Sequence, residues 1–281
     1  MLKKEQITRF LLPSIFVVWT WNQANAAPSN ISAYFAGEDA CFLLYDVGKG
    51  QAVTKYNEKR CSERVPPCST FKVALALMAF DKGILKDENA VIKWDGKTYE
   101  MPGWNKDQTA VSWMKESTIW VSQRITKELG KKTVEKYLRD FGYGTADMSG
   151  GIETAWLTAT SLAYPVKPTV LISAEEQAQF LTKLWKGELP VSKHAIEMVK
   201  KATFIEKSPQ GFELSGKTGS GFVGGDRSVR VGWFVGHLAK GNEQYVSVIA
   251  LTDSVKSEGK GYAGPEARET TKKILKELGK Y

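Results

Sequence analysis

Strand-like segments lie near both ends of this chain, and helical patterns fill its middle. An apolar run at 41–47 and an alternating run at 51–56 flank Gly48-Lys49-Gly50, a combination that predicts a β-hairpin. Further strands are expected late in the chain, at 212–219, 229–239 and 244–253. Because strands and helices do not alternate, we predict an α+β fold: an antiparallel β-sheet with terminal helices and an inserted helical lobe.

Apolar residues recur at helical spacing through the middle of the chain and at its end. We expect helices over 69–82, 109–128, 132–141, 173–186, 193–202 and 265–278. A capping box formed by Ser173 and Glu176 marks the start of one of them. The proline-containing segment 158–170 is expected to be a long irregular loop.

The first residues have the pattern of an export signal. Lys3, Lys4 and Arg9 precede a short apolar stretch, and Ala24-Asn25-Ala26 fits a small-residue cleavage site. We therefore predict a signal peptide over 1–26, one domain over 27–281, and a periplasmic location. The alternative, an N-terminal membrane anchor, is disfavoured because the apolar stretch is too short to span a bilayer.

Composition narrows the classes of partner. The chain has 39 Lys and Arg against 31 Asp and Glu, a net charge of +8. No basic run is interleaved with aromatic residues, and an exported protein rarely meets nucleic acid, so we expect no nucleic-acid partner. After signal cleavage we also expect no membrane partner. The oligomeric state stays open.

Three cysteines and two histidines limit the possible chemistry. His194 and His237 offer little material for a histidine-based triad or a zinc site, so we expect no metal. An odd cysteine count leaves one thiol free. Cys41 and Cys61 are the best pair on hairpin grounds, but pairing Val47 with Gln51 places Cys41 opposite position 57, so the pairing stays open.

Ser69-Thr70-Phe71-Lys72 opens the first expected helix, just after Pro66 and Pro67. At this spacing the Ser69 hydroxyl and the Lys72 amine share one helix face, so the lysine can serve as a base for a serine nucleophile. The same spacing recurs at Ser112–Lys115 and Ser257–Lys260, so it is not diagnostic alone.

Residues 211–218 match the phosphate-binding pattern G-x-x-x-x-G-K-[ST]. That loop requires a helix to start at the lysine, and Gly219-Ser220-Gly221 cannot start one. On a strand, Lys217 and Thr218 can instead present a cation and a hydroxyl to a carboxylate. The backbone N–H groups of Ser69 and Ser220 can then form an oxyanion hole.

Ser117-Thr118-Ile119 lies within the segment expected to be helical over 109–128. A serine inside a helix is usually a packing or back-bonding residue. Here the Ser117 hydroxyl could relay a proton between Lys72 and a leaving amine.

Together these motifs resemble the penicilloyl-serine transferase family and, within it, the class D β-lactamases or oxacillinases. Ser69-Thr70-Phe71-Lys72, Ser117-Thr118-Ile119 and Lys217-Thr218-Gly219 are similar to the three class D motifs, with Ile in place of Val in the second. Matches extend over nearly all of the mature chain, through segments around Trp94-Asp95-Gly96, Met101, Trp104, Tyr143-Gly144, Ser149-Gly150-Gly151, Ala155-Trp156-Leu157 and Arg268.

Two departures from the family pattern concern the same region. Thr145 stands where the family has an asparagine after Tyr-Gly, and the loop after Trp156 is longer than the family's. Substrate range therefore does not transfer from the resemblance.

The resemblance implies hydrolysis of penicillin-type β-lactams, and hence antibiotic resistance, through an acyl-enzyme on Ser69. Lys72 would be carboxylated by CO₂ and act as general base, with no separate cofactor; its carbamate would be stabilised by the Trp156 indole. Ser117 would relay the proton, and the Ser69 and Ser220 N–H groups would hold the oxyanion. The resemblance assigns the remaining substrate contacts to Trp104, Ile119, Lys217, Thr218 and Arg268.

Two alternatives share the same nucleophile. A β-lactam sensor domain is acylated without turnover, but such domains follow several membrane helices, which we do not expect here. A cell-wall transpeptidase or carboxypeptidase usually has an asparagine at the position of Ile119. Class A β-lactamases are disfavoured because the chain has no Ser-Asp-Asn motif.

Overall fold

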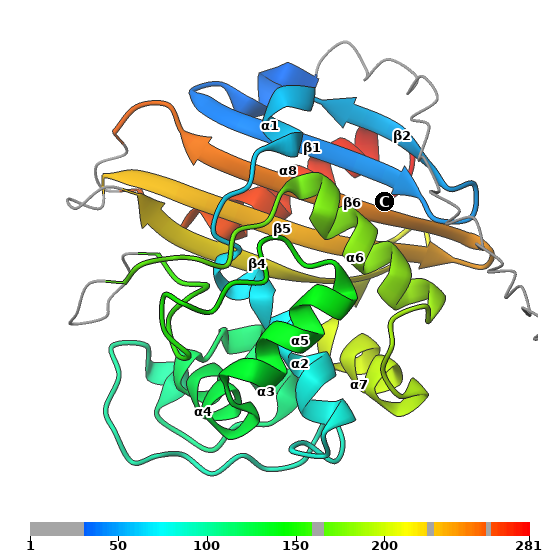
Figure 1. The fold of residues 1–281 in the computed structure, drawn as a ribbon. Coiled ribbons are helices and arrows are strands. Elements are labelled where there is room, and N and C mark those ends of the chain that lie inside the picture. Colours follow the sequence, from blue (N-terminus) through cyan, green and yellow to red (C-terminus); the bar gives the residue numbers. More distant parts are fainter. Residues whose placement is uncertain (1–30, 159–165, 224–227, 257–259) are drawn as a thin grey trace, which may run out of the picture.

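A computed structural model describes residues 31–158, 166–223, 228–256 and 260–281 (Figure 1). Its centre is a six-stranded antiparallel sheet with strand order β2-β1-β6-β5-β4-β3. The strands are β1 (Glu38–Asp46), β2 (Gln51–Tyr56), β3 (Phe204–Lys207), β4 (Glu213–Val223), β5 (Val229–Lys240) and β6 (Glu243–Asp253). The early hairpin joins the sheet beside the last strand, which confirms the predicted α+β fold.

The helices also follow the expected order. They are α1 (Glu58–Ser62), α2 (Phe71–Asp81), α3 (Ala110–Glu116), α4 (Ile119–Leu129), α5 (Lys131–Phe141), α6 (Ala174–Lys186), α7 (Lys193–Thr203) and α8 (Ala263–Glu277). Short 3₁₀ turns lie at Ile31–Phe35, Cys68–Thr70 and Pro102–Trp104. Helix α1 and strand β3 were not predicted, because segments of five and four residues are too short to show a period.

The two faces of the sheet support two separate apolar clusters. Alternate side chains of β1 point to opposite faces: Phe42 and Leu44 pack toward α8, whereas Cys41 and Leu43 belong to the cluster shared with the helical lobe. In Figure 1, α8 lies behind the sheet and α6 lies in front of it. Because β1 is buried on both faces, it reads as a continuous apolar run rather than an alternating one.

Helix α2 lies at the centre of the helical lobe (Figure 1). Every residue from Phe71 to Phe80 is buried and all except Lys72 are apolar, so the helix is apolar on all sides rather than amphipathic. The 3₁₀ turn Cys68–Thr70 precedes it and lies against β4 and β5. The start of α2 is therefore located where the sheet and the lobe meet.

The single helix predicted over 109–128 was wrong. Helix α3 ends at Glu116 and α4 begins at Ile119, because Ser117 adopts the left-handed conformation with φ of 55°. Buried residues such as Trp113 and Trp120 lie on both sides of the break, so apolar periodicity does not reveal a two-residue interruption. Ser117 is thus a helix-ending residue whose hydroxyl is free to point away from the helix.

A disulfide joins Cys41 and Cys61, with 5.0 Å between their Cα atoms. The expected Val47–Gln51 pairing was wrong by one residue: Asp46 pairs with Gln51, and a bulge between Leu44 and Tyr45 follows. By strand pairing, Cys41 lies opposite Asn57, four residues before Cys61. Helix α1 begins after Asn57 and brings Cys61 back by one helical turn, so the two cysteines meet. Cys68 is the free cysteine, and it is buried.

The proposed signal peptide over 1–26 and most of the irregular loop 158–170 lie outside the described residues. Among the helices that the structure describes, none combines the length and the apolarity needed to cross a bilayer.

We predict that the double variant Cys41→Ala, Cys61→Ala unfolds at lower denaturant concentration than the parent. The bridge closes a segment with a sequence separation of 20, and its loss costs roughly 3 kcal/mol through the greater entropy of the unfolded chain. Urea unfolding followed by tryptophan fluorescence measures the difference. A reducing agent should destabilise the parent by a similar amount and leave the double variant unchanged; equal stability of the parent and the double variant would contradict this account.

Candidate active site

Ser69 and Lys72 meet at the start of α2. The Lys72 amine donates a hydrogen bond to Ser69 Oγ at 3.0 Å. Lys72 is fully buried, and this burial, reinforced by the nearby positive charge of Lys217, lowers its pKa well below the ordinary value. The lowered pKa favours the neutral amine form of Lys72 over the ammonium form. The amine can therefore accept a proton or react through its lone pair.

A buried hydrogen-bond network holds the turn that carries Ser69. Gln177 on α6 donates to Thr70 Oγ1 at 2.9 Å and to the Tyr143 hydroxyl at 3.3 Å. Thr70 in turn donates to the Pro67 carbonyl at 2.7 Å. The sequence prediction missed Gln177, although a polar residue in line with the apolar Ala174 and Leu181 on the buried face of α6 was a usable sign.

Trp156 lies buried against α2. Its ring stacks on Phe71 with the centroids 4.8 Å apart, and its carbonyl accepts the Cys68 N–H at 3.1 Å. The indole Nε1 is buried and has no acceptor among the residues that the structure describes. Because an unsatisfied buried donor costs about 1–3 kcal/mol, this atom marks a place where a ligand oxygen would be favourable.

Ser117 and Lys217 form a second polar pair. The Lys217 amine donates to Ser117 Oγ and to the Thr218 carbonyl, the latter at 2.9 Å. Burial, together with the charge of Arg268, lowers the pKa of Lys217 to about 7. The left-handed conformation of Ser117 makes this contact possible, because a serine inside a continuous helix would project differently.

Strand β4 approaches the Ser69 turn closely enough to exclude side chains. A Cβ atom on Gly219 would lie 2.8 Å from the Pro67 carbonyl oxygen, and one on Gly221 would lie 2.1 Å from Thr158 Oγ1. Ser220 lies between these glycines, and its hydroxyl accepts the Gly264 N–H of α8 at 2.9 Å. Residues 213–218 of the phosphate-loop pattern thus lie in β4, as the glycine-rich segment Gly219-Ser220-Gly221 after the lysine predicted.

A cleft of about 250 Å³ gathers most of the predicted residues. It is lined by Ser69, Trp104, Ser117, Ile119, Thr218 and Ser220, together with Met101, Lys115, Glu116, Tyr262 and Pro265. Lys72 and Lys217 contact Ser69 and Ser117 without lining the cleft themselves. Arg268 lines an adjoining hollow, which it shares with Lys217 and Thr218, and pairs with Glu269 at 3.0 Å.

Thr145, the departure from the family pattern, has a structural role. Its hydroxyl donates to the Thr169 carbonyl at 2.6 Å and accepts the Leu171 N–H at 3.0 Å. Its own N–H donates to the Leu171 carbonyl. Gly144 is required beside it, because a Cβ atom there would lie 1.9 Å from the Leu171 oxygen. These contacts hold residues 169–171, at the end of the lengthened loop, against Thr145.

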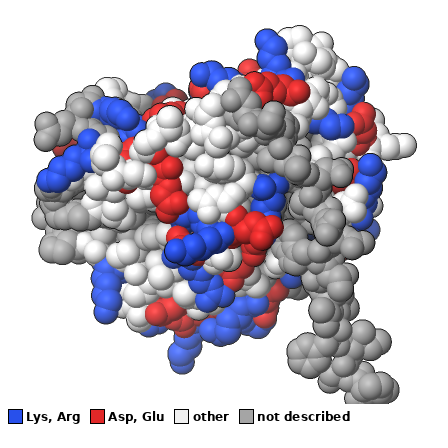
Figure 2. Space-filling model, turned by 90° about the horizontal axis from the view of Figure 1, so that it is seen from above, with Lys and Arg blue, Asp and Glu red and all other residues white. Residues whose placement is uncertain are grey.

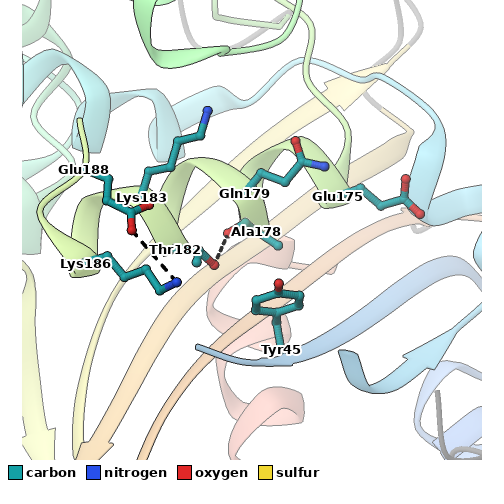
Figure 3. Close-up of a pocket in the computed structure, with 8 residues that line it drawn as sticks. All are labelled: Tyr45, Glu175, Ala178, Gln179, Thr182, Lys183, Lys186 and Glu188. Atoms are coloured by element: carbon teal, nitrogen blue, oxygen red, sulfur yellow. Dashed lines mark hydrogen bonds and ion pairs between the residues drawn. The ribbon is translucent and has the colours of Figure 1, made fainter. Parts of the chain in front are cut away.

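Two further surface features lie apart from the cleft. Basic and acidic side chains are intermingled on the face shown in Figure 2. A separate hollow of about 140 Å³ lies between Tyr45 of β1 and α6, near Thr182 and the Lys186–Glu188 ion pair (Figure 3). None of the residues predicted for the site lines this hollow.

Comparisons with known proteins agree with this geometry. The family model for the penicillin-binding protein transpeptidase domain matches residues 40–276. β-Lactamase OXA-1 from Escherichia coli is 39% identical over 233 residues, which cover 80% of each chain. A class D β-lactamase structure from Bacillus subtilis matches with a TM-score of 0.77 and 35% identity, covering 92% of this chain and 98% of that chain. The C-terminal domain of the BlaR penicillin receptor from Bacillus licheniformis matches with a TM-score of 0.80 and 29% identity, over 92% and 99%.

We predict that Gln177→Leu lowers both stability and the rate at which Ser69 reacts. The substitution keeps the volume but removes the amide that donates to the Thr70 and Tyr143 hydroxyls, while Thr70 keeps its bond to Pro67. Loss of a buried donor of this kind costs about 1–3 kcal/mol. Chemical denaturation and the rate of acylation by a penicillin measure the two effects. Gln179→Leu is the matched control, because Gln179 lies on the same helix and is exposed. Equal losses in the two variants would show that the buried network does not hold the turn.

Proposed function

This chain belongs to the class D β-lactamases and hydrolyses the amide bond of β-lactams, and we propose that Ser69 carries the acyl group while carboxylated Lys72 is the general base. The observation that carries the proposal is the buried Lys72 amine at 3.0 Å from Ser69 Oγ. No histidine takes part in it, since His194 and His237 line neither the cleft nor the adjoining hollow.

The surroundings of Lys72 fit a carbamate. A neutral amine is the form of lysine that combines with CO₂, and burial lowers the Lys72 pKa toward that form. Trp156 Nε1 is a buried donor without an acceptor among the described residues, and it would hold a carbamate oxygen. When present, the group supplies a carboxylate oxygen as a general base near neutral pH.

In acylation, Ser69 Oγ gives its proton to the Lys72 side chain and forms a bond to the lactam carbonyl carbon. The ring C–N bond then breaks, and the nitrogen receives a proton through Ser117, which Lys217 holds in place. The N–H groups of Ser69 and Ser220 stabilise the oxyanion, at about 3 kcal/mol for each donor. Water then cleaves the Ser69 ester and releases the opened product.

The remaining cleft residues bind the substrate. Lys217 and Thr218, with Arg268 in the adjoining hollow, supply two cations and a hydroxyl for the substrate carboxylate. Trp104 and Ile119 line the cleft as apolar walls. The carboxylate side of the substrate thus faces the two cations, and its apolar side faces Trp104 and Ile119.

The proposal extends to location. Residues 1–26 act as a signal peptide, and the domain over 27–281 functions in the periplasm, where β-lactams arrive before they reach the cell-wall enzymes. The support is the basic and apolar pattern of the first residues together with the Ala24-Asn25-Ala26 cleavage site.

The alternative to hydrolysis with turnover is a penicillin receptor, because the C-terminal domain of the BlaR penicillin receptor has the same fold. We predict that incubation with excess penicillin gives many equivalents of opened product and only transient acyl-protein. Mass spectrometry and product absorbance follow the two species together. A stable adduct with one equivalent of product would instead indicate a receptor or a cell-wall enzyme.

Ser69→Ala is expected to remove both the adduct and turnover, lowering the hydrolysis rate by roughly 10⁴-fold or more, as for loss of other catalytic nucleophiles. Ser112→Ala is the matched control, since Ser112 also precedes a lysine by three residues but caps helix α3. That variant should keep its activity. Appreciable hydrolysis by Ser69→Ala would refute the assignment of the nucleophile.

Activity should depend on CO₂ and on pH. Acid protonates the Lys72 amine, and a protonated amine cannot hold CO₂, so the rate should fall as pH is lowered in degassed buffer and recover with added bicarbonate. Trp156→Phe should need more bicarbonate, whereas Trp185→Phe, near His237, should behave like the parent. Steady-state rates against bicarbonate at several pH values test this; rates independent of bicarbonate in all three proteins would rule out the carbamate.

A further inference from the structure

The catalytic cleft continues into a second hollow of about 240 Å³, which we call the side pocket. Lys115 and Thr218 line both spaces, so the two hollows adjoin beside the third sequence motif. The side pocket is enclosed by α3, by the junction between α7 and β3, and by the part of β4 that carries Lys217. It is nearly equal in volume to the cleft itself.

One wall of the side pocket is apolar, and part of it is open to solvent. It is formed by Val111, Met114, Phe204 and Ile205. Phe204 is 52% exposed and Val111 is 37% exposed, so both side chains present apolar surface to solvent at the side pocket. Because they border the same hollow, their exposed surface is available to an apolar group that enters it.

The side pocket also has cationic residues in its lining. Lys115, Lys217 and Arg268 line the side pocket, and no acidic residue is among its lining. The charge of Arg268 contributes to the lowered pKa of Lys217, so the two cations repel each other. An anion placed between them would relieve that repulsion. The side pocket thus combines a carboxylate-binding edge with an apolar wall.

We propose that the side pocket is a specificity site that receives an apolar substituent on the carboxylate-bearing ring of a β-lactam, with Phe204 and Val111 as the specificity-determining residues. The proposal rests on the function proposed above, in which the substrate carboxylate lies at Thr218 and Arg268. A substituent on the ring atom next to that carboxylate then enters the side pocket. The acyl side chain, on the other side of the substrate, stays in the cleft beside Trp104.

The test compares two cephalosporins with the same acyl side chain. One has a methyl group and the other a benzyl-type group on the ring carbon next to the carboxylate-bearing carbon. The parent protein should hydrolyse the benzyl compound at least as efficiently as the methyl compound. In Phe204→Ser and Val111→Ser, kcat/KM for the benzyl compound should fall roughly tenfold, through KM, because apolar contacts are lost. The methyl compound should be hydrolysed as before.

Val91→Ser is the matched control, because Val91 is 60% exposed and lines neither hollow. Val111→Ser keeps the test valid even if Phe204→Ser does not fold. An unchanged ratio of the two kcat/KM values in both folded pocket variants would overturn the proposal, as would a parent protein that strongly prefers the methyl compound. Failure of the parent to hydrolyse any β-lactam would instead overturn the proposed function.

Discussion

The burial of the Lys72 amine is the constraint on which the rest of the site depends. A charged ammonium is costly to bury without a partner, whereas a neutral amine is tolerated inside an apolar helix. Helix α2 supplies that environment because it is apolar on all sides and lies at the centre of the helical lobe. The packing that stabilises the fold therefore also lowers the pKa of Lys72, the proposed base, so a mutation that changes this packing should affect both stability and the lysine.

The topology explains how distant segments meet at this lysine. Strand β1 pairs with β6, so an early and a late segment of the chain share one sheet. The helical lobe is formed by segments that lie between them in the sequence. The Ser69 turn then lies against β4, and the break between α3 and α4 carries Ser117 to Lys217. Ser69 immediately precedes α2, Ser117 lies in the break between α3 and α4, and Lys217 lies within β4, so the three motifs come together where the helical lobe meets the sheet.

Sequence patterns predicted the fold class, the main strands and most helices, because these depend on periodicity and capping. They did not predict the break at Ser117, since the buried positions continue on both sides of it. The closing of the Cys41–Cys61 bridge depended on α1, a helix too short to recognise. The roles of Gln177 and Arg268 depend on which neighbours tertiary packing places beside them, which no local pattern contains.

The glycines of β4 have a consequence for how this protein can adapt. At Gly219 and Gly221 the backbone of β4 lies so close to the turn that carries Ser69, the proposed nucleophile, and to Thr158 that almost any substitution introduces a clash. Substitution is therefore sterically restricted at Gly219 and Gly221 and less restricted at exposed side chains such as Phe204, which lines the side pocket. We expect changes of substrate range to arise from substitutions at exposed positions of this kind, while Gly219 and Gly221 stay unchanged.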